Sequence, residues 1–258
     1  MGAAPTLRET AMLAITGLSK RYGETVALDQ ATIFFRAGTV HTILGENGSG
    51  KSTLVKLLSG IVLPDAGAIS FDDQPVIARS PATFQAAGFA TAFQEVLIAP
   101  DRSVTDNILL GLDGLFIRRI PRLERRDRAA EVLSRFARTP IDLDAAAGSL
   151  PLAAQQLVVL ARAVAREPRV LILDEITAAL DFADRESVFA FMRARAAAGC
   201  LILFITHRMD EVMALSDDIS VLRSGRVVTT QTRDASTPSQ LLHLMAPQKA
   251  QQLEAQHG

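Results

Sequence analysis

The feature that most constrains this chain is segment 45–52, which follows an apolar run at 39–44 and opens a predicted apolar helix at 52–58. The segment reads Gly-Glu-Asn-Gly-Ser-Gly-Lys-Ser, and this spacing between a strand and a helix is typical of a phosphate-binding loop. Glycines let backbone amides turn towards an anion, and the helix start adds a partial positive charge. The segment therefore predicts an α/β fold in which a strand delivers a phosphate cradle to a helix.

The side chains of this loop suit a nucleotide and a divalent cation. Lys51 is predicted to neutralise the β- and γ-phosphates, and the Ser52 hydroxyl to ligate Mg²⁺. The alternative is a flexible Gly-Ser loop with an exposed lysine, but the chain has only four lysines, so a chance match to the pattern is rare. The predicted nucleotide-binding residues of this loop are Gly45, Glu46, Asn47, Gly48, Ser49, Gly50, Lys51, Ser52 and Thr53.

A pair of carboxylates follows a second apolar run, at 170–173. Because ligands of open α/β sheets bind at the carboxyl ends of the strands, Asp174 and Glu175 are expected beside the phosphate loop. Asp174 is predicted to hold Mg²⁺, and Glu175 to accept a proton from an attacking water. The alternative is an ordinary acidic turn after a strand.

Hydrophobic patterning divides the chain into three parts. Continuous apolar strands that alternate with helices predict a parallel sheet covered on both faces, and the Ala-, Leu- and Arg-rich segment 101–165 predicts a helical insertion into it. The polar end of the chain is expected to form a docked helix and then a frayed tail. Strands are predicted at 12–15, 26–35, 39–44, 170–173, 201–205 and 227–230, with a helix at 184–198.

Composition excludes several classes of protein. A net charge of −1 removes the global attraction that a sequence-independent nucleic-acid binder uses, and no apolar run approaches the roughly 18 residues of a membrane span. The single cysteine, Cys200, lies in an apolar run and is predicted to be a buried, inert thiol. No internal repeat is present, so a second catalytic half is expected to come from another chain.

Taken together with the loop and the acidic pair, four further residues make the chain resemble the nucleotide-binding domain of an ABC transporter between about residues 12 and 228. Tyr22 matches the aromatic residue that stacks on adenine, Gln94 the glutamine that senses Mg²⁺, Asp181 the loop at the dimer interface and His207 the switch histidine near the γ-phosphate. The resemblance implies that Glu175, His207 and Gln94 are catalytic, and that Ser52, Asp174 and Gln94 form the metal site.

The same resemblance implies the organisation of the chain. It predicts one ABC ATPase domain over 1–258: a P-loop NTPase core of mostly parallel sheet flanked by helices, with an antiparallel β subdomain near the amino terminus. The expected parts are an ATP-binding core at about 12–94 and 166–230, an inserted helical subdomain at about 95–165 that carries the signature segment, and a polar tail at 231–258.

One segment departs from the family pattern. The signature Leu-Ser-Gly-Gly-Gln, which contacts the γ-phosphate bound by a second domain, falls by register on Leu150, Pro151, Leu152, Ala153 and Ala154. Proline has neither a hydroxyl nor an N–H, and the loss of one hydrogen bond to a charged phosphate costs about 1.5 to 3 kcal/mol. This half-site is therefore predicted to be degenerate, which favours pairing with a different ATPase over a homodimer. Ile176, where the family usually has proline, removes no reactive group.

The stretches 106–111, 155–163 and 206–212 look most like carbohydrate-uptake ATPases of the ribose and galactose type. That likeness implies an ATP-hydrolysing subunit with ATP and Mg²⁺, on the cytoplasmic face of the cell membrane. The implied partners are a second ABC ATPase, transmembrane permease subunits and a solute-binding protein, with no nucleic acid. Two alternatives stay open: a nucleotide-gated scaffold with little hydrolysis, and a soluble ABC ATPase outside transport.

An arginine-rich stretch at 118–128 invites a nucleic-acid or lipid-headgroup interpretation. Acidic residues interrupt it, and Leu123 with the neighbouring alanines is predicted to supply a buried stripe, so a solvated helix face is the favoured interpretation of the arginines.

Overall fold

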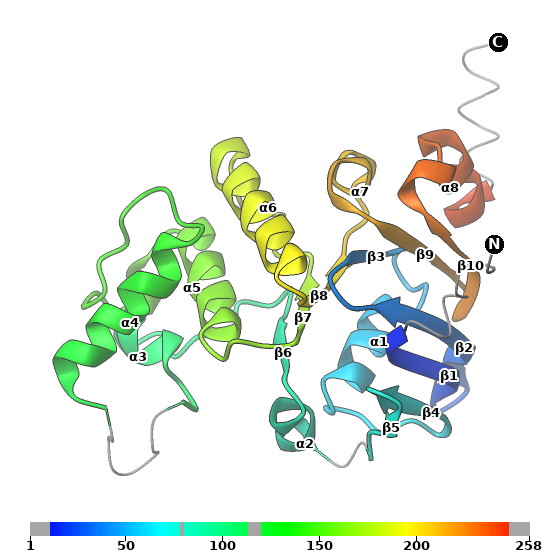
Figure 1. The fold of residues 1–258 in the computed structure, drawn as a ribbon, viewed down its shortest axis with the longest axis horizontal. Coiled ribbons are helices and arrows are strands. Elements are labelled where there is room, and N and C mark those ends of the chain that lie inside the picture. The colour runs from blue at the N-terminus through cyan, green and yellow to red at the C-terminus, as the bar shows by residue number, and fades with distance from the viewer. Residues whose placement is uncertain (1–10, 78–79, 113–119, 248–258) are drawn as a thin grey trace, which may run out of the picture.

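The computed structural model describes residues 11–77, 80–112 and 120–247, which form two sheets with helices around them (Figure 1). The strands are β1 (Ala11–Tyr22), β2 (Thr25–Arg36), β3 (Val40–Leu44), β4 (Ala66–Phe71), β5 (Gln74–Pro75), β6 (Phe89–Ala92), β7 (Val170–Asp174), β8 (Leu201–Ile205), β9 (Asp218–Arg223) and β10 (Arg226–Thr232). The helices are α1 (Lys51–Leu58), α2 (Pro81–Ala86), α3 (Val104–Ile108), α4 (Arg122–Ser134), α5 (Leu152–Val164), α6 (Phe182–Ala197), α7 (Met209–Leu215) and α8 (Pro238–Met245). Among these helices, none is both long and apolar enough to cross a bilayer.

The central sheet has the strand order β10-β9-β3-β8-β7-β6, and all of its neighbouring pairs are parallel except β9 with β10. Every residue of β3, β7 and β8 is buried, because successive side chains of a strand point to opposite faces and both faces are covered. Leu171 and Leu173 pack in the cluster that includes α5 and α6, whereas Ile172 packs in the cluster that includes α1. The predicted α/β fold with a mostly parallel sheet is confirmed.

The antiparallel sheet, in the order β2-β1-β4-β5, lies on the α1 side of the central sheet. Helix α1 packs between the two sheets, since its buried leucines Leu54, Leu57 and Leu58 join one cluster with side chains of both. The loop between β3 and α1 is therefore held at one end by the central sheet and at the other end by the packed helix.

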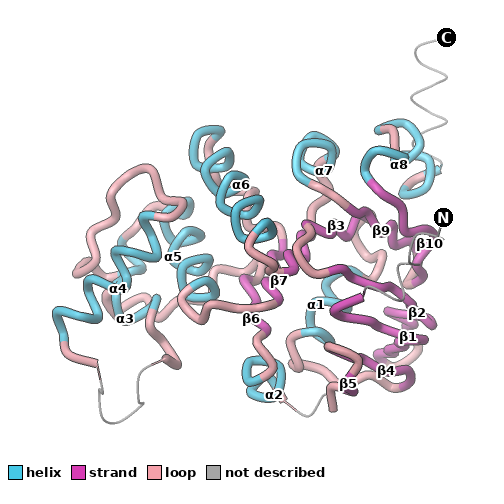
Figure 2. Tube along the Cα trace, in the orientation of Figure 1, coloured by secondary structure: helices cyan, strands magenta, loops and turns pink. Residues whose placement is uncertain are grey.

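The helical region between β6 and β7 is less regular than its composition suggested. Helix α3 has five residues and long loops join the helices, as Figure 2 shows. The Asn107 side chain donates to the carbonyl oxygens of Ala99, Arg102 and Ser103 at 3.0–3.3 Å and accepts from the Ala99 N–H at 2.8 Å. Such side-chain hydrogen bonds satisfy backbone groups outside a helix, so the chain folds into loops despite its helix-forming residues.

The arginine-rich stretch leads into α4, and the expectation of a solvated arginine face is wrong at one position. The prediction that Leu123 is buried is also wrong, since its side chain is exposed and the buried face of α4 is formed by other residues. Arg122, Arg126 and Arg128 are exposed, but Arg125 is buried and its guanidinium lies 2.7 Å from the carboxylate of Asp106. Residues 118 and 119 lie outside the described residues. Arg125 therefore ties α4 to α3 instead of facing solvent.

Two smaller predictions concern the later part of the chain. Cys200 is buried, and burial raises the pKa of its thiol, as expected of an inert cysteine. Helix α8 docks through the fully buried Leu241 and begins with Thr237 and Gln240, each of whose side chains accepts from the other's backbone N–H. The tail beyond 247 lies outside the described residues.

Candidate active site

The loop between β3 and α1 needs glycine at its two ends. Gly50 has φ +110°, and a Cβ there would lie 2.7 Å from the carbonyl oxygen of Ala27. A Cβ on Gly45 would lie 2.4 Å from the carbonyl oxygen of Leu222. Backbone atoms of the neighbouring strands therefore leave no room for a side chain at either end of the loop. The amino terminus of α1 is directed at the space above the loop.

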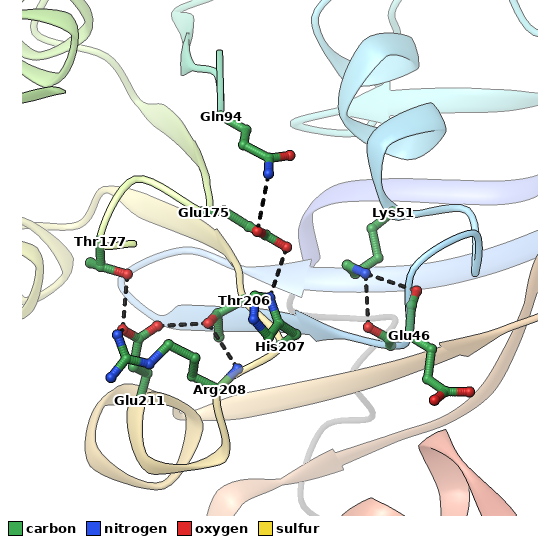
Figure 3. A network of polar contacts seen from close by, with 10 residues as sticks. Glu46, Lys51, Gln94, Glu175, Thr177, Thr206, His207, Arg208 and Glu211 are labelled. Atoms are coloured by element: carbon green, nitrogen blue, oxygen red, sulfur yellow. Dashed lines mark hydrogen bonds and ion pairs between the residues drawn. The ribbon is translucent and has the colours of Figure 1, made fainter. Parts of the chain in front are cut away.

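Lys51 is buried at the first position of α1, with 6% of its surface exposed. Its Nζ donates to the carbonyl oxygens of Gly45 at 2.8 Å and Glu46 at 3.0 Å (Figure 3). Burial lowers the pKa of this ammonium, although the nearby carboxylates of Glu175 and Asp174 act in the opposite direction. The loop thus holds a poorly hydrated cation that an anion in the cleft would stabilise.

An open cleft of about 640 Å³ lies over the loop. Most of the predicted phosphate-binding residues line it, together with three residues from the start of β2 that sequence analysis did not single out. The lining residues are Thr25, Val26, Ala27, Asn47, Gly48, Gly50, Lys51, Ser52, Thr53, Gln94, Glu175 and His207.

Asp174 ends β7 with 6% of its surface exposed. Burial, followed by the charge of the adjacent Glu175, raises the pKa of the Asp174 carboxyl to about 6, while Lys51 pulls it down. Within the described part of the chain, no cluster of three or more His, Cys, Asp or Glu side chains could hold a metal ion. The buried carboxylate of Asp174 and the Ser52 hydroxyl in the cleft are ligand types that fit Mg²⁺, because this ion commonly takes only one or two protein carboxylates and shares substrate phosphates.

Gln94, Glu175 and His207 come together across the cleft from three different elements. The Gln94 Nε2 donates to one oxygen of the Glu175 carboxylate at 3.3 Å, and the His207 Nδ1 lies 3.0 Å from the other (Figure 3). Gln94 follows β6 and His207 follows β8. The parallel order β6-β7-β8 brings these loops to one edge, so all three residues singled out by sequence analysis meet at one carboxylate.

A second polar cluster lies beneath that carboxylate and was missed by sequence analysis. The carboxylate of Glu211, on α7, accepts from the Thr206 hydroxyl at 2.6 Å and from the Thr177 hydroxyl at 2.9 Å (Figure 3). Glu211 is 1% exposed. The sequence offered only the spacing of four residues between His207 and Glu211 as a signal. It gave no sign that Thr177 lies near them, because the order of strands in the sheet brings Thr177 close.

Besides the signature segment, six predicted site residues do not line the cleft: Tyr22, Gly45, Glu46, Ser49, Asp174 and Asp181. Tyr22 ends β1 and is 45% exposed, beside the strand β2 whose first residues form a wall of the cleft. Asp181 caps α6 by accepting from the Asp184 N–H at 2.8 Å. Ser49 is buried, and its hydroxyl has no hydrogen-bond partner among the described residues.

The signature segment, at residues 150–154, is not brought to this cleft. Pro151 is the N-cap of α5, with φ −56° and ψ 151°, and offers no side-chain hydrogen bond to the helix. Leu152 is 59% exposed. Figure 1 shows α5 in the helical region, apart from α1, and none of residues 150–154 lines the cleft.

Comparison with known proteins agrees with this geometry. A family model described as ABC transporter matches residues 28–178. A ribose import ATP-binding protein of Rhizobium johnstonii, RbsA 1, is 42% identical over 229 residues, which cover 89% of this chain and 45% of that protein. A putative ribose/galactose/methyl galactoside import ATP-binding protein of Burkholderia cenocepacia is 36% identical, with 91% of this chain and 46% of that protein covered. The chain spans about half the length of the curated relatives it matches.

Solved structures share the fold. CbiO1 of Clostridium perfringens, part of the cbiONQ ABC transporter complex, has a TM-score of 0.73 and 28% identity, covering 95% of this chain and all of that one. An ATP-binding cassette of an ABC transporter in its ADP conformation has a TM-score of 0.77 and 25% identity, covering 95% of this chain and 98% of that one.

Proposed function

The chain belongs to the ABC transporter family, and from that premise we propose that it binds and hydrolyses ATP to drive the transport of a solute. The observation that carries this proposal is the Glu175 carboxylate, held between Gln94 and His207 over a cleft whose floor is a phosphate-binding loop.

The hydrolytic step follows from the position of Glu175. Its carboxylate is a hydrogen-bond acceptor at the edge of the cleft, and it is suited to take a proton from the water that attacks the γ-phosphate. Gln94 and His207 fix its two oxygens, so the base need not reorganise before the reaction. His207 is also in place to stabilise negative charge that develops on the γ-phosphate.

Nucleotide binding falls to the loop and its surroundings. Lys51 exchanges its two carbonyl partners for phosphate oxygens, while the amides of the loop and of the α1 amino terminus point at the remaining phosphate charge. Tyr22 is proposed to contact adenine. Mg²⁺, held by Ser52, Asp174 and Gln94, would offset phosphate charge and relieve the repulsion between Asp174 and Glu175.

The replacement Glu175→Gln tests this assignment, because it keeps the shape of the side chain and removes the base. We expect ATP to bind with unchanged affinity while hydrolysis falls by about a hundredfold or more. ATP binding is measured by calorimetry and hydrolysis by phosphate release, with Glu186→Gln, an exposed glutamate on α6, as the matched control. Hydrolysis at the parent rate in Glu175→Gln would show that another group is the base.

The chain has the predicted cleft residues but departs from the family signature, which supports pairing with a second, different ATPase domain. We assign residues 12–94 and 166–230 to the ATP-binding core, about 95–165 to the signature-bearing helical subdomain, and 231–258 to a polar tail. Because Pro151 and Ala154 lack the side chains of the family signature, a partner domain with an intact signature would complete the site on this chain, whereas this chain would complete the partner's site poorly.

The relatives point to the biological setting. Their names describe import of ribose and of related sugars, so a sugar-type importer is the proposed system, with this chain on the cytoplasmic face of the cell membrane. The proposed partners are permease subunits, a second ATPase domain and a solute-binding protein. Copurification with a polytopic membrane protein tests this setting, whereas recovery with ribosomes or nucleic acid would favour a role outside transport.

A second candidate function is a nucleotide-gated scaffold that binds ATP and hardly hydrolyses it. The uncapped, apolar signature segment at Pro151 and Leu152 favours this alternative. Single-turnover hydrolysis in the presence of the cognate partner separates the two, because a scaffold retains ATP while an ATPase releases phosphate.

A further inference from the structure

The strongest unexplained feature near the cleft is a fully buried carboxylate. Glu211, on α7, is not among the residues that line the cleft, and its two carboxylate oxygens accept from the hydroxyls of Thr206 and Thr177 at 2.6 and 2.9 Å. Arg208 is 3.5 Å away. A buried carboxylate is costly unless hydrogen bonds and charge compensate for its lost hydration, so this cluster serves more than packing.

The two threonines belong to the loops that carry the hydrolytic residues. Thr177 follows Glu175 by two positions, and Thr206 immediately precedes His207. Both loops leave neighbouring parallel strands, with Asp174 paired opposite Ile205. Glu211 therefore provides a second link between the two loops that the Glu175–His207 contact already joins.

The backbone of Glu175 needs such support. Its φ of +50° lies in the left-handed region, which is unfavourable for a residue other than glycine and persists only where the surroundings enforce it. On its amino-terminal side, the strained Glu175 is held by its own N–H, which donates to the carbonyl oxygen of Ile205 at 3.0 Å. On its carboxyl-terminal side, Thr177 is held to Thr206 through the Glu211 carboxylate.

We propose that Glu211 is a positioning residue for hydrolysis: by binding Thr177 and Thr206, it sets the distance between the Glu175 carboxylate and His207 (Figure 3). The inference rests on the proposed ATPase function and adds to it a residue outside the nucleotide cleft. Loss of the bridge displaces the base while leaving Lys51 and the phosphate loop in place, since these are held by β3 and α1.

The test compares Glu211→Ala and Glu211→Gln with the parent in single-turnover and steady-state hydrolysis. We expect kcat to fall by about a hundredfold in Glu211→Ala, the scale of loss from a displacement of about 1 Å, with KM and the ATP dissociation constant within about threefold of the parent. Glu211→Gln keeps the shape and one acceptor oxygen, so it loses less. The matched control is Glu186→Gln, an exposed glutamate on α6, which we expect to leave kcat unchanged.

Two additional variants separate positioning from a general loss of stability. Thr177→Val and Thr206→Val each remove one arm of the bridge, and neither is expected to lower kcat further when combined with Glu211→Ala, because residues that act through one network are not additive. Amide hydrogen exchange of residues 174–178 and 205–208 is expected to accelerate in Glu211→Ala, without a change in β3. These variants carry the test if Glu211→Ala does not fold.

The outcomes distinguish this inference from the proposed function. If the parent hydrolyses ATP, Glu175→Gln does not, and Glu211→Ala or both threonine variants keep the parent kcat, the positioning role is wrong while the ATPase function stands. A rise in KM as large as the fall in kcat in Glu211→Ala would also overturn the positioning role. If the parent itself binds no ATP, the proposed function fails first.

Discussion

The phosphate loop and the signature segment are both helix starts, but they are built very differently. At α1, close backbone contacts shape the loop, and the buried Lys51 places a cation at the start of the helix. At α5, Pro151 caps the helix without a side-chain hydrogen bond, and the exposed Leu152 follows it. One helix start is organised to receive a polyanion, whereas the other presents an apolar surface.

This difference indicates that the phosphate loop, which serves the chain's own cleft, and the signature segment can change independently of each other. The residues around Glu175 depend on the central sheet, while the signature depends on the helical region attached to it. Under the proposed function, a change at Pro151 is expected to leave the cleft of its own chain intact and to weaken the site on a second domain to which it is presented.

The largest effect should come from removing the cation of the phosphate loop. In Lys51→Ala we expect ATP affinity to fall about a hundredfold, since a hydrogen bond from a charged group is worth about 3 kcal/mol at most. Calorimetry at millimolar ATP measures the loss. Lys56→Ala, an exposed lysine on the same helix, is the control. Equal binding by Lys51→Ala and the parent would remove the basis of the contrast between the two helix starts.

Restoring the family residues in the signature segment should reduce the difference between the two helix starts. The double replacement Pro151→Ser and Ala154→Gln is expected to raise the ATPase rate of the chain alone by about tenfold to a hundredfold, because a hydroxyl becomes available to the γ-phosphate of a second copy. Turnover with a partner that has an intact signature should change little if the partner's own site contributes little.

Serine at 151 would also cap α5, which could raise stability by itself. Pro121→Ser is the matched control, since Pro121 caps α4 in the same backbone conformation and lies outside the signature. Brisk, cooperative turnover by the unmodified chain would contradict a degenerate signature.

A smaller effect concerns the stability lost when the buried Asp174 carboxyl ionises. The pKa of Asp174 is raised to about 6 by burial and by Glu175, so its ionised form destabilises the nucleotide-free fold above that pH. Asp174→Asn should therefore unfold at higher temperature than the parent at pH 7.5, with the difference vanishing as pH falls from about 6 to 4. The exposed Asp73→Asn serves as control. A variant less stable than the parent at pH 7.5 would show that the ionised carboxylate is not a burden.

A further pH effect comes from His41 on β3, the strand that leads into the phosphate loop. Its Nε2 lies 2.8 Å from the Ser220 hydroxyl, and burial, with Arg36 nearby, lowers its pKa to about 3. The folded state keeps the ring neutral, so its contribution to stability is complete above pH 6.5 and is lost as pH falls towards 3. This loss opposes the gain from Asp174 in the same range.

Urea unfolding between pH 6.5 and 4 measures the His41 contribution. In His41→Gln the slope of unfolding free energy against pH should decrease by about 1.4 kcal/mol per pH unit. A slope equal to that of the parent would mean that another group governs acid unfolding.

Much of the fold and site followed from local patterns. The runs at 170–173 and 201–205 are apolar at every position, which is typical of strands buried on both faces, and both form strands of the central sheet. The loop glycines before Lys51 and the acidic pair after β7 carry their chemistry in adjacent residues. The helical region was less predictable, because Asn107 satisfies the backbone of loops that composition assigned to helix.

The sequence by itself determined the identity of the groups in the cleft, since a phosphate loop and a carboxylate at a strand end are encoded by neighbouring residues. Only the tertiary structure decided how they meet: that Glu175 lies between Gln94 and His207, and that Glu211 bridges the two loops from below. The physical reason is the parallel order of β6, β7 and β8, which brings together side chains separated by 81 and 32 positions along the chain.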